Sequence, residues 1–419
     1  MHLRTAHRLS LFELICPPLK HPVSSNLNAE QQRTLITLSV GTFASQSSVR
    51  LCDPMLPQLA KDFSQSIGEV AMVITSFSIA YGLFQLIHGP MGDYAGKLRW
   101  IRYASIAAAL ASGACMLAAS LPQLLALRFI AGAACAALIP LSLAWIGDEV
   151  PYQARQAVLA QFMTGSTAGA VFGQVAGGVM ADTLGWRLSF AIPAFVLVAV
   201  AIALTLSRPS VIAPARSQPP TARSIAMQFE AVLQRSWARV MLAVVFFEGL
   251  VVYGAFAYVP SWLHIAFDMP LWRAGLAAAG FGLGGVVYSL GASYLIRTLG
   301  EQGLLAAGGL VFALGLSLVG GSGWPEQMLF CTFMGLGFFM VHNTLQVQAT
   351  QMAPHARGTA IAAFAVGLFS GQSIGVAIGS NIMNAYGFRL LQWGSASLFV
   401  LLALVTAFLV RRRQRNPDE

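Results

Sequence analysis

Glu248 is an acidic residue inside a long apolar stretch of this 419-residue chain. It follows Arg239 by nine residues, which places it roughly 14 Å along a helix, and no other acid lies near the middle of such a stretch. A carboxyl group at that depth in a membrane is rare and normally faces a cavity, where it can load and release a proton. We expect Glu248 to serve proton coupling or substrate binding. The structural alternative is a permanently protonated, hydrogen-bonded glutamic acid.

Three further charged residues, Arg50, Asp53 and Arg128, could form a buried cluster. Arg128 lies about seven residues from one end of its apolar stretch and Asp53 about six from the corresponding end of its own, so their depths are similar. An ion pair between them is therefore possible, and a buried arginine without a partner would be costly. Arg50 precedes Asp53 by three residues and could compete for the carboxylate or complete a triad. A fixed pair that only joins two helices is the structural alternative to a role in coupling.

Polar and aromatic residues around position 340 share one helical face. These residues are Phe339, His342, Asn343 and Gln346. Such a stripe could line a substrate cavity or form hydrogen bonds between helices, and a lone buried histidine such as His342 is more often structural than titrating. Near Glu248, the rings of Phe247 and Tyr253 would suit a bulky or cationic substrate, although aromatic residues in membrane helices commonly face lipid.

The apolar stretches that carry these residues predict an all-α membrane protein. A composition that is 56% hydrophobic and 10% charged describes no soluble protein of this length. Twelve stretches are each long enough to cross about 30 Å of hydrocarbon as a helix. They lie near residues 34–59, 69–92, 101–119, 122–147, 157–181, 187–207, 237–262, 272–297, 303–321, 327–350, 358–382 and 389–410.

The distribution of Lys and Arg predicts the orientation of these spans. With a cytoplasmic N-terminus, 19 of the 25 basic residues fall inside and four outside, as the positive-inside rule requires. The net charge of +9 therefore reports topology, and we expect no nucleic-acid partner. Residues 1–33 lack a signal-peptide pattern, and we expect them to form a cytoplasmic arm. We expect residues 208–236 to form a cytoplasmic linker with a short interfacial helix, and 411–419 a basic cytoplasmic tail. We expect a multi-pass protein of a bacterial-type inner membrane, with both termini in the cytoplasm.

A glycine ladder in the fifth predicted span reveals an internal repeat. The segment GSTAGAVFGQVAGG contains Gly165, Gly169, Gly173, Gln174, Gly177 and Gly178. Small residues at four-residue spacing are the usual means of close helix packing in lipid. A shift of 202 residues places four of these glycines on glycines of the eleventh span, and Arg155 and Arg187 on Arg357 and Arg389. This indicates two parallel six-helix bundles, residues 34–207 and 237–410.

In three motifs the chain resembles the major facilitator superfamily, and within it the twelve-span drug:proton antiporters. The segment GPMGDYAGKLR is similar to the loop motif G-x-L-A-D-R-x-G-R-[KR] and supplies Gly89, Asp93, Gly96, Lys97 and Arg99 as a candidate cytoplasmic gate. RFIAG, which begins at Arg128, is similar to the family's R-x-x-x-G motif, and the resemblance assigns this arginine to coupling. The glycine ladder resembles the antiporter motif G-x-x-x-G-x-x-x-G-P-x-x-G-G, except that Gln174 stands where that motif has proline.

The resemblance implies the major facilitator fold and a secondary transporter that works by alternating access. We expect proton-driven export of a small hydrophobic or amphipathic compound by a monomer in the lipid bilayer, with the proton gradient as energy source and no cofactor or metal. Two alternatives stay open. The first is a proton symporter or facilitator for uptake of a sugar or organic acid, and the second is a receptor or assembly partner that does not transport. Since a Walker loop, a nucleophile elbow and a zinc-ligand cluster are all missing, we do not expect an enzyme.

Overall fold

The computed structural model describes residues 27–207, 221–353 and 357–415, and every regular element in these ranges is a helix. Residues 1–26 of the expected cytoplasmic arm, 208–220 of the linker and 416–419 of the tail lie outside the described residues. In the N-terminal half the elements are α2 (Ala29–Arg50), η2 (Asp53–Met55), α3 (Leu56–Phe63), α4 (Ile67–Val70), α5 (Met72–Ala95), α6 (Lys97–Cys115), α7 (Leu121–Cys135), α8 (Leu138–Glu149), α9 (Tyr152–Thr183), α10 (Trp186–Ser189) and α11 (Ala191–Leu206).

The C-terminal half repeats this pattern with fewer breaks. Its elements are α12 (Ala222–Leu233), α13 (Ser236–Phe256), α14 (Val259–Phe267), α15 (Leu271–Leu318), α16 (Trp324–Gln351), α17 (Arg357–Tyr386) and α18 (Phe388–Arg415). The 48-residue α15 contains a non-helical residue, Gly300, with φ of 62°, where two helices join. The short helix α12 falls within the predicted linker and begins with a capping box between Thr221 and Ser224.

Eight helical stretches among the described residues are long and apolar enough to cross a membrane. This criterion supports a multi-pass membrane protein but does not establish the predicted count of twelve. It joins the two predicted spans of α15 into one stretch and omits the regions of α2, α6 and α9. Helices α2 and α9 carry many Ser, Thr, Gln and Gly residues, and α6 begins with basic residues, so each is less apolar than its neighbours.

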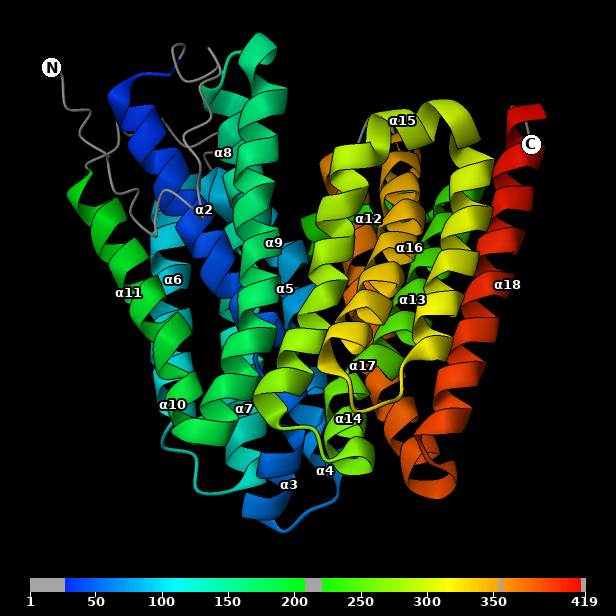
Figure 1. The fold of residues 1–419 in the computed structure, drawn as a ribbon. Coiled ribbons are helices and arrows are strands. Elements are labelled where there is room, and N and C mark those ends of the chain that lie inside the picture. The colour runs from blue at the N-terminus through cyan, green and yellow to red at the C-terminus, as the bar shows by residue number, and fades with distance from the viewer. Residues whose placement is uncertain (1–26, 208–220, 354–356, 416–419) are drawn as a thin grey trace, which may run out of the picture.

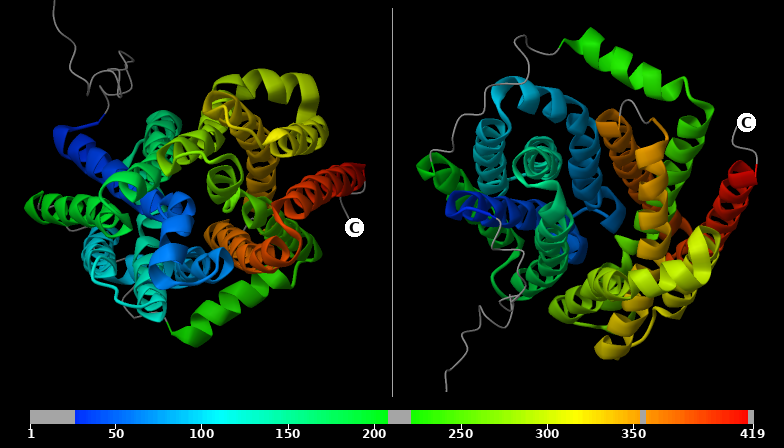
Figure 2. Two further views of the ribbon diagram at one scale, coloured as in Figure 1. Left: turned by 60° about the horizontal axis from the view of Figure 1, so that its bottom comes forward. Right: turned by 90° about the horizontal axis from the view of Figure 1, so that it is seen from above.

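Figure 1 shows the helices of the N-terminal half gathered on one side of the molecule and α13–α18 on the other. The start of α2 and the end of α18 lie at the same end of the molecule, at the top of the view. Short elements, including α3, α4, α10 and α14, lie at the opposite end, which we call the α3 end. The views along the helices separate the same two groups (Figure 2).

The glycine ladder packs α9 directly against the backbone of α2. A Cβ atom added at Gly165, Gly169, Gly173 or Gly177 would meet a backbone oxygen of α2 or of the turn after it. These oxygens step along the chain by four residues and belong to Ser39, Phe43, Ser47 and Leu51. The glycines of α17 meet α13 in the same way, at the backbone oxygens of Leu242, Phe246, Leu250 and Gly254. The prediction of a close-packing stripe is therefore confirmed in both copies of the repeat.

The two halves contact each other near the α3 end. Gly178 of α9 lies against the backbone of Leu271 at the start of α15, and Gly68 of α4 lies against Ser380 of α17. Gly178 and Ser380 are themselves related by the 202-residue shift. The carboxylate of Asp182 accepts a hydrogen bond of 2.7 Å from the backbone N–H of Trp272, so α9 caps the first turn of α15.

We predict that Gly169→Ala destabilises the fold by about 1–3 kcal/mol, because its methyl group would collide with the backbone oxygen of Phe43. Unfolding in detergent micelles measures this change. Gly394→Ala in α18 is the matched control, since an added Cβ there meets nothing within 4 Å, and its effect should stay within about 0.5 kcal/mol. Equal stabilities of the two variants would contradict the proposed packing.

Candidate functional site

Asp53 lies at a break in the first long helix of the chain. Helix α2 ends at Arg50, two turn residues follow, and the short helix η2 begins at Asp53 with Pro54 next to it. Because proline has no N–H to donate, it cannot continue the hydrogen bonds of α2. The break places the Asp53 carboxylate, which has no solvent exposure, at the N-terminus of η2.

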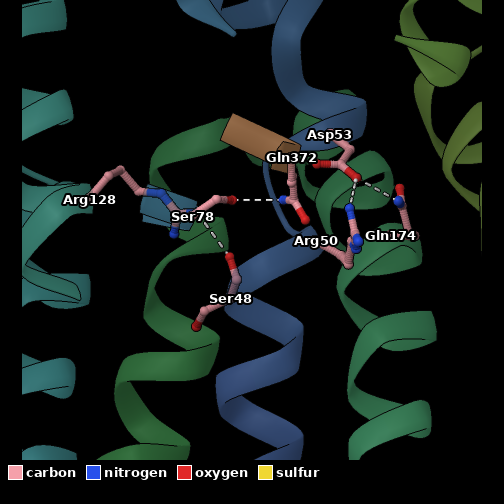
Figure 3. Close-up of polar contacts among 7 residues, drawn as sticks. All are labelled: Ser48, Arg50, Asp53, Ser78, Arg128, Gln174 and Gln372. Atoms are coloured by element: carbon pink, nitrogen blue, oxygen red, sulfur yellow. Dashed lines mark hydrogen bonds and ion pairs between the residues drawn. The ribbon is translucent and has the colours of Figure 1, made fainter. Parts of the chain in front are cut away.

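Two side chains hold this buried carboxylate. Arg50 Nη1 lies 3.6 Å from Asp53 Oδ2, and Gln174 Nε2 of α9 donates a hydrogen bond of 2.8 Å to the same oxygen. Figure 3 shows both contacts converging on Asp53. Gln174 is only 2% exposed, so the residue that replaces the motif's proline acts as a buried hydrogen-bond donor, and α9 runs as one helix from Tyr152 to Thr183.

Arg128 does not form the predicted ion pair with Asp53; among the described residues its guanidinium has other partners. Nη2 donates to the backbone oxygen of Ser48 at 3.0 Å, and the guanidinium carbon lies 4.1 Å from the ring centre of Phe77. The end of α2 explains why Arg128 has these partners. Carbonyl groups in the last turn of a helix, such as that of Ser48, have no partner within the helix and are available as acceptors. Arg128 meets them from the side opposite to Gln174 (Figure 3).

Glu248 and His342, predicted as separate candidates, form one pair in the structure. His342 Nδ1 of α16 lies 3.0 Å from Glu248 Oε2 of α13. The side chain of Glu248 is fully buried, whereas that of His342 is 14% exposed. Within the described ranges, the second carboxyl oxygen, Oε1, has no hydrogen-bond partner. The distance is compatible with a proton on either residue, so the pair can share one proton.

Aromatic rings connect this pair to the Asp53 cluster. The guanidinium carbon of Arg50 lies 4.2 Å from the ring centre of Tyr253. This contact joins the N-terminal half to the C-terminal half. Tyr253 packs edge-to-face on Phe338 at 5.6 Å, and Phe338 stacks on His342 at 5.0 Å. Tyr253, a predicted cavity candidate, is only 7% exposed and occupies the middle of this connection.

The remaining cavity candidates are placed differently. Phe339 packs against Phe281 and Phe338, and Asn343 donates to the backbone oxygen of Phe339 in its own helix. Gln346 is exposed. Phe247 is 51% exposed and packs against its neighbour Phe246, and neither a hydrogen bond nor a ring contact joins it to the Glu248 pair. The structure therefore brings His342 and Tyr253 to the site but leaves Phe247 out of it.

The predicted gate motif lies at the junction of α5 and α6. Gly96 joins the two helices with φ of 87°, a conformation that glycine adopts readily. Lys97 lies 3.6 Å from Asp93 and forms a shorter contact of 2.6 Å with Asp148 of α8. Arg99 is exposed, and an added Cβ at Gly89 would meet open space. The contact with Asp148 was not predicted, because it joins residues 51 positions apart that share no local pattern.

Sequence reasoning also missed a buried hydrogen bond between the halves. Gln372 Nε2 of α17 donates to Ser78 Oγ of α5 at 2.7 Å, and both residues are buried (Figure 3). A glutamine inside the glycine ladder of the eleventh predicted span was the available signal. One turn towards the α3 end, Thr75 donates to the backbone oxygen of Ser373 at 3.2 Å.

Comparison of the sequence with known proteins gives a consistent assignment. The family model described as Major Facilitator Superfamily matches residues 38–376. The chain is 26% identical over 367 residues to the uncharacterized MFS-type transporter YceJ of Bacillus subtilis (strain 168), which covers 84% of this chain and 90% of YceJ. It is 28% identical over 171 residues to the multidrug export protein EmrB of Escherichia coli (strain K12), and this match covers 41% of this chain and 33% of EmrB.

Solved structures share the fold. The nucleoside transporter NupG matches with a TM-score of 0.73 and 12% identity, over 91% of this chain and 99% of that chain. A bacterial homolog of the human lysosomal transporter Spinster, in an inward-facing and unoccupied conformation, matches with a TM-score of 0.69 and 17% identity, over 92% and 98% of the two chains. At these identities the likeness concerns the fold alone.

We predict that Glu248 and His342 stabilise the protein as a coupled pair. A double-mutant cycle with Glu248→Gln and His342→Asn, measured by unfolding in detergent, should give an interaction energy of about 1.5–3 kcal/mol, the range for a hydrogen bond to a charged group. A second cycle pairs Glu248→Gln with Thr344→Val, since Thr344 bonds within its own helix at Met340, and should be additive within about 0.5 kcal/mol. Additivity in both cycles would show that the pair is not coupled.

Proposed function

The chain belongs to the Major Facilitator Superfamily, and we propose that it exports a small hydrophobic or amphipathic compound in exchange for protons. Members of this family are membrane transporters rather than enzymes. The observation that carries the proposal is the buried pair of Glu248 and His342, at 3.0 Å, inside a helical bundle. The partial similarity to the exporter EmrB supports the direction of transport.

The pair provides a site for one exchangeable proton. Because Glu248 is fully buried and His342 is partly exposed, a proton from water reaches the carboxyl group through the imidazole ring. Protonation removes the charge of Glu248 and changes which of the two groups donates the hydrogen bond. Phe338 and Phe364 pack against His342 but are almost fully buried, whereas Phe339, which packs against Phe338, is partly exposed and is the ring that an apolar or cationic substrate would meet.

We propose that the chain crosses the membrane twelve times as two six-helix bundles, residues 34–207 and 237–410. The 202-residue repeat, the matching glycine ladders and the break at Gly300 in α15 support this count. The contacts between halves at Gly178, Gly68 and Asp182 lie near the α3 end, which we assign to the outer side from the distribution of Lys and Arg. Alternating access then requires that these contacts separate while contacts form at the opposite end. We further propose a monomer in a bacterial-type inner membrane with both termini in the cytoplasm.

Transport in proteoliposomes with an imposed pH gradient tests the function. We expect the wild type to move an amphipathic dye against the direction of proton flow, and Glu248→Gln to lose this gradient-driven accumulation while still passing the dye down its own concentration gradient. Glu326→Gln, which removes an exposed acid at the start of α16, is the matched control and should transport like the wild type.

Other outcomes of the same assay would contradict proton-driven export. Movement of a sugar or organic acid together with protons would indicate a symporter. Movement that does not depend on the pH gradient would indicate a facilitator. Binding without flux would indicate a receptor. Gradient-driven transport retained in Glu248→Gln would remove this residue from the coupling mechanism.

We also predict that Asp93→Asn lowers the transport rate without lowering the amount of protein in the membrane. The substitution removes the carboxylate 3.6 Å from Lys97 but leaves the contact between Lys97 and Asp148 in place, so the junction of α5 and α6 should stay folded. Membrane fractionation measures the amount of protein, and initial rates in proteoliposomes measure transport. A wild-type rate would exclude Asp93 from the cytoplasmic gate.

A further inference from the structure

Gln174 contacts both Asp53 and the C-terminal half of the molecule. Its side chain donates to Asp53 Oδ2 at 2.8 Å, whereas its backbone oxygen lies where a methyl group on Gly275 of α15 would collide with it. The residue is buried and sits next to Gly173, whose close contact with α2 brings the amide within reach of Asp53. It therefore lies between a titratable carboxyl group and the interface of α9 with α15.

Two acceptor oxygens of the Asp53 cluster lack a hydrogen-bond donor. Within the described part of the chain, Asp53 Oδ1 and Gln174 Oε1 are both buried without a hydrogen-bond partner. Arg50 Nη1 is at ion-pair distance from Asp53, 3.6 Å, but is also without a hydrogen bond. Buried acceptors without donors are costly, and one added proton on Asp53 would supply a donor to this cluster.

Arginine and glutamine respond differently to that proton. A guanidinium group only donates, so Arg50 favours the ionised form of Asp53. A primary amide carries a donor and an acceptor of nearly the same shape, and a half-turn about its last bond exchanges them. Gln174 can therefore bond to either form of the carboxyl group without repacking its surroundings.

We propose that Gln174 is a positioning residue that keeps Asp53 bonded to α9 in both protonation states. In the ionised state Nε2–H donates to the carboxylate. After one proton from water has bound to Asp53, the O–H group donates to Oε1, and Arg50 keeps its charge over the rings of Tyr253 and Phe256. This inference rests on the proposed proton coupling and gives it a second proton site, besides the pair of Glu248 and His342.

Other titratable and charged groups surround Asp53. Arg50 approaches from α2, Arg128 from α7 and Tyr253 from α13, and Cys52 is the preceding residue. Helices α14 and α15 also pack against η2, and in the described structure they contribute neither a hydrogen bond nor an ion pair to Asp53. Beside these groups, Gln174 supplies an uncharged amide that hydrogen-bonds directly to Asp53 and can either donate or accept.

Infrared spectroscopy of the full-length protein in liposomes tests this role without a substrate. Spectra are recorded during a titration between about pH 4 and pH 9, the range in which a perturbed carboxyl group exchanges its proton. The bands that disappear in Asp53→Asn are assigned to Asp53. In Gln174→Met, which keeps the volume but loses donor and acceptor, we expect both the carboxylate band and the carboxylic acid C=O band of Asp53 to shift. Gln174→Leu repeats the test should Gln174→Met not fold.

Gln372→Met is the matched control, because this buried amide bonds to Ser78 rather than to Asp53 and should leave both bands in place. A shift of the carboxylate band alone would show that Gln174 serves only the ionised form and would overturn the proposal, as would a titration with no acid band of Asp53. Because these bands report protonation and not flux, failure of this inference is distinct from failure of export in the transport assay.

Discussion

Close backbone contact between α2 and α9 is the constraint on which the site depends. Four glycines at four-residue spacing let the two helices approach until the carbonyl groups of one face the Cα atoms of the other. A Cβ atom at any of them would clash with a backbone oxygen of the facing segment, so the helices would have to move apart. The reach of Gln174 to Asp53 is therefore a consequence of Gly173 and Gly177 on either side of it. The same glycine spacing in α17 fixes its distance from α13, the helix that carries Glu248.

Buried charges are stabilised in different ways in the two halves. In the N-terminal half, the break between α2 and η2 creates both an acid at a helix N-terminus and unpaired carbonyl groups at a helix C-terminus. The side chains of Arg50 and Gln174 hold the Asp53 carboxylate, and the backbone oxygen of Ser48 accepts from Arg128, so Asp53 and Arg128 do not need each other. In the C-terminal half, the partner of Glu248 among the described residues is His342, whose own charge depends on protonation.

The contact of Arg50 with Tyr253 links these two arrangements across the boundary between the halves. The attraction between a cation and an aromatic ring weakens little when the ring slides. A hydrogen bond weakens steeply when its distance or angle changes. This kind of contact suits the alternating access proposed above, in which the boundary opens and closes. The hydrogen bonds of Gln372 with Ser78 and of Asp182 with Trp272 fix the observed arrangement of the two halves more strictly, since each joins atoms at 2.7 Å.

The sequence by itself determined the features that depend on neighbours along the chain. Hydrophobic runs located the helices, and the glycine spacing and its copy at a shift of 202 residues located the close-packed faces. The three-residue spacing of Arg50 and Asp53 indicated that Arg50 could compete with Arg128 for this carboxylate, and Arg50 is the arginine that pairs with it. Only the tertiary structure decided which distant residues meet: Glu248 with His342, 94 positions apart, and Asp53 with Gln174, 121 positions apart. The reason is geometric, because one residue turns a helix by about 100°, so the rotation and depth that select a partner follow from packing and not from local pattern. The predicted pair of Asp53 and Arg128 had the right depth, but the free carbonyl groups at the end of α2 gave the arginine other partners.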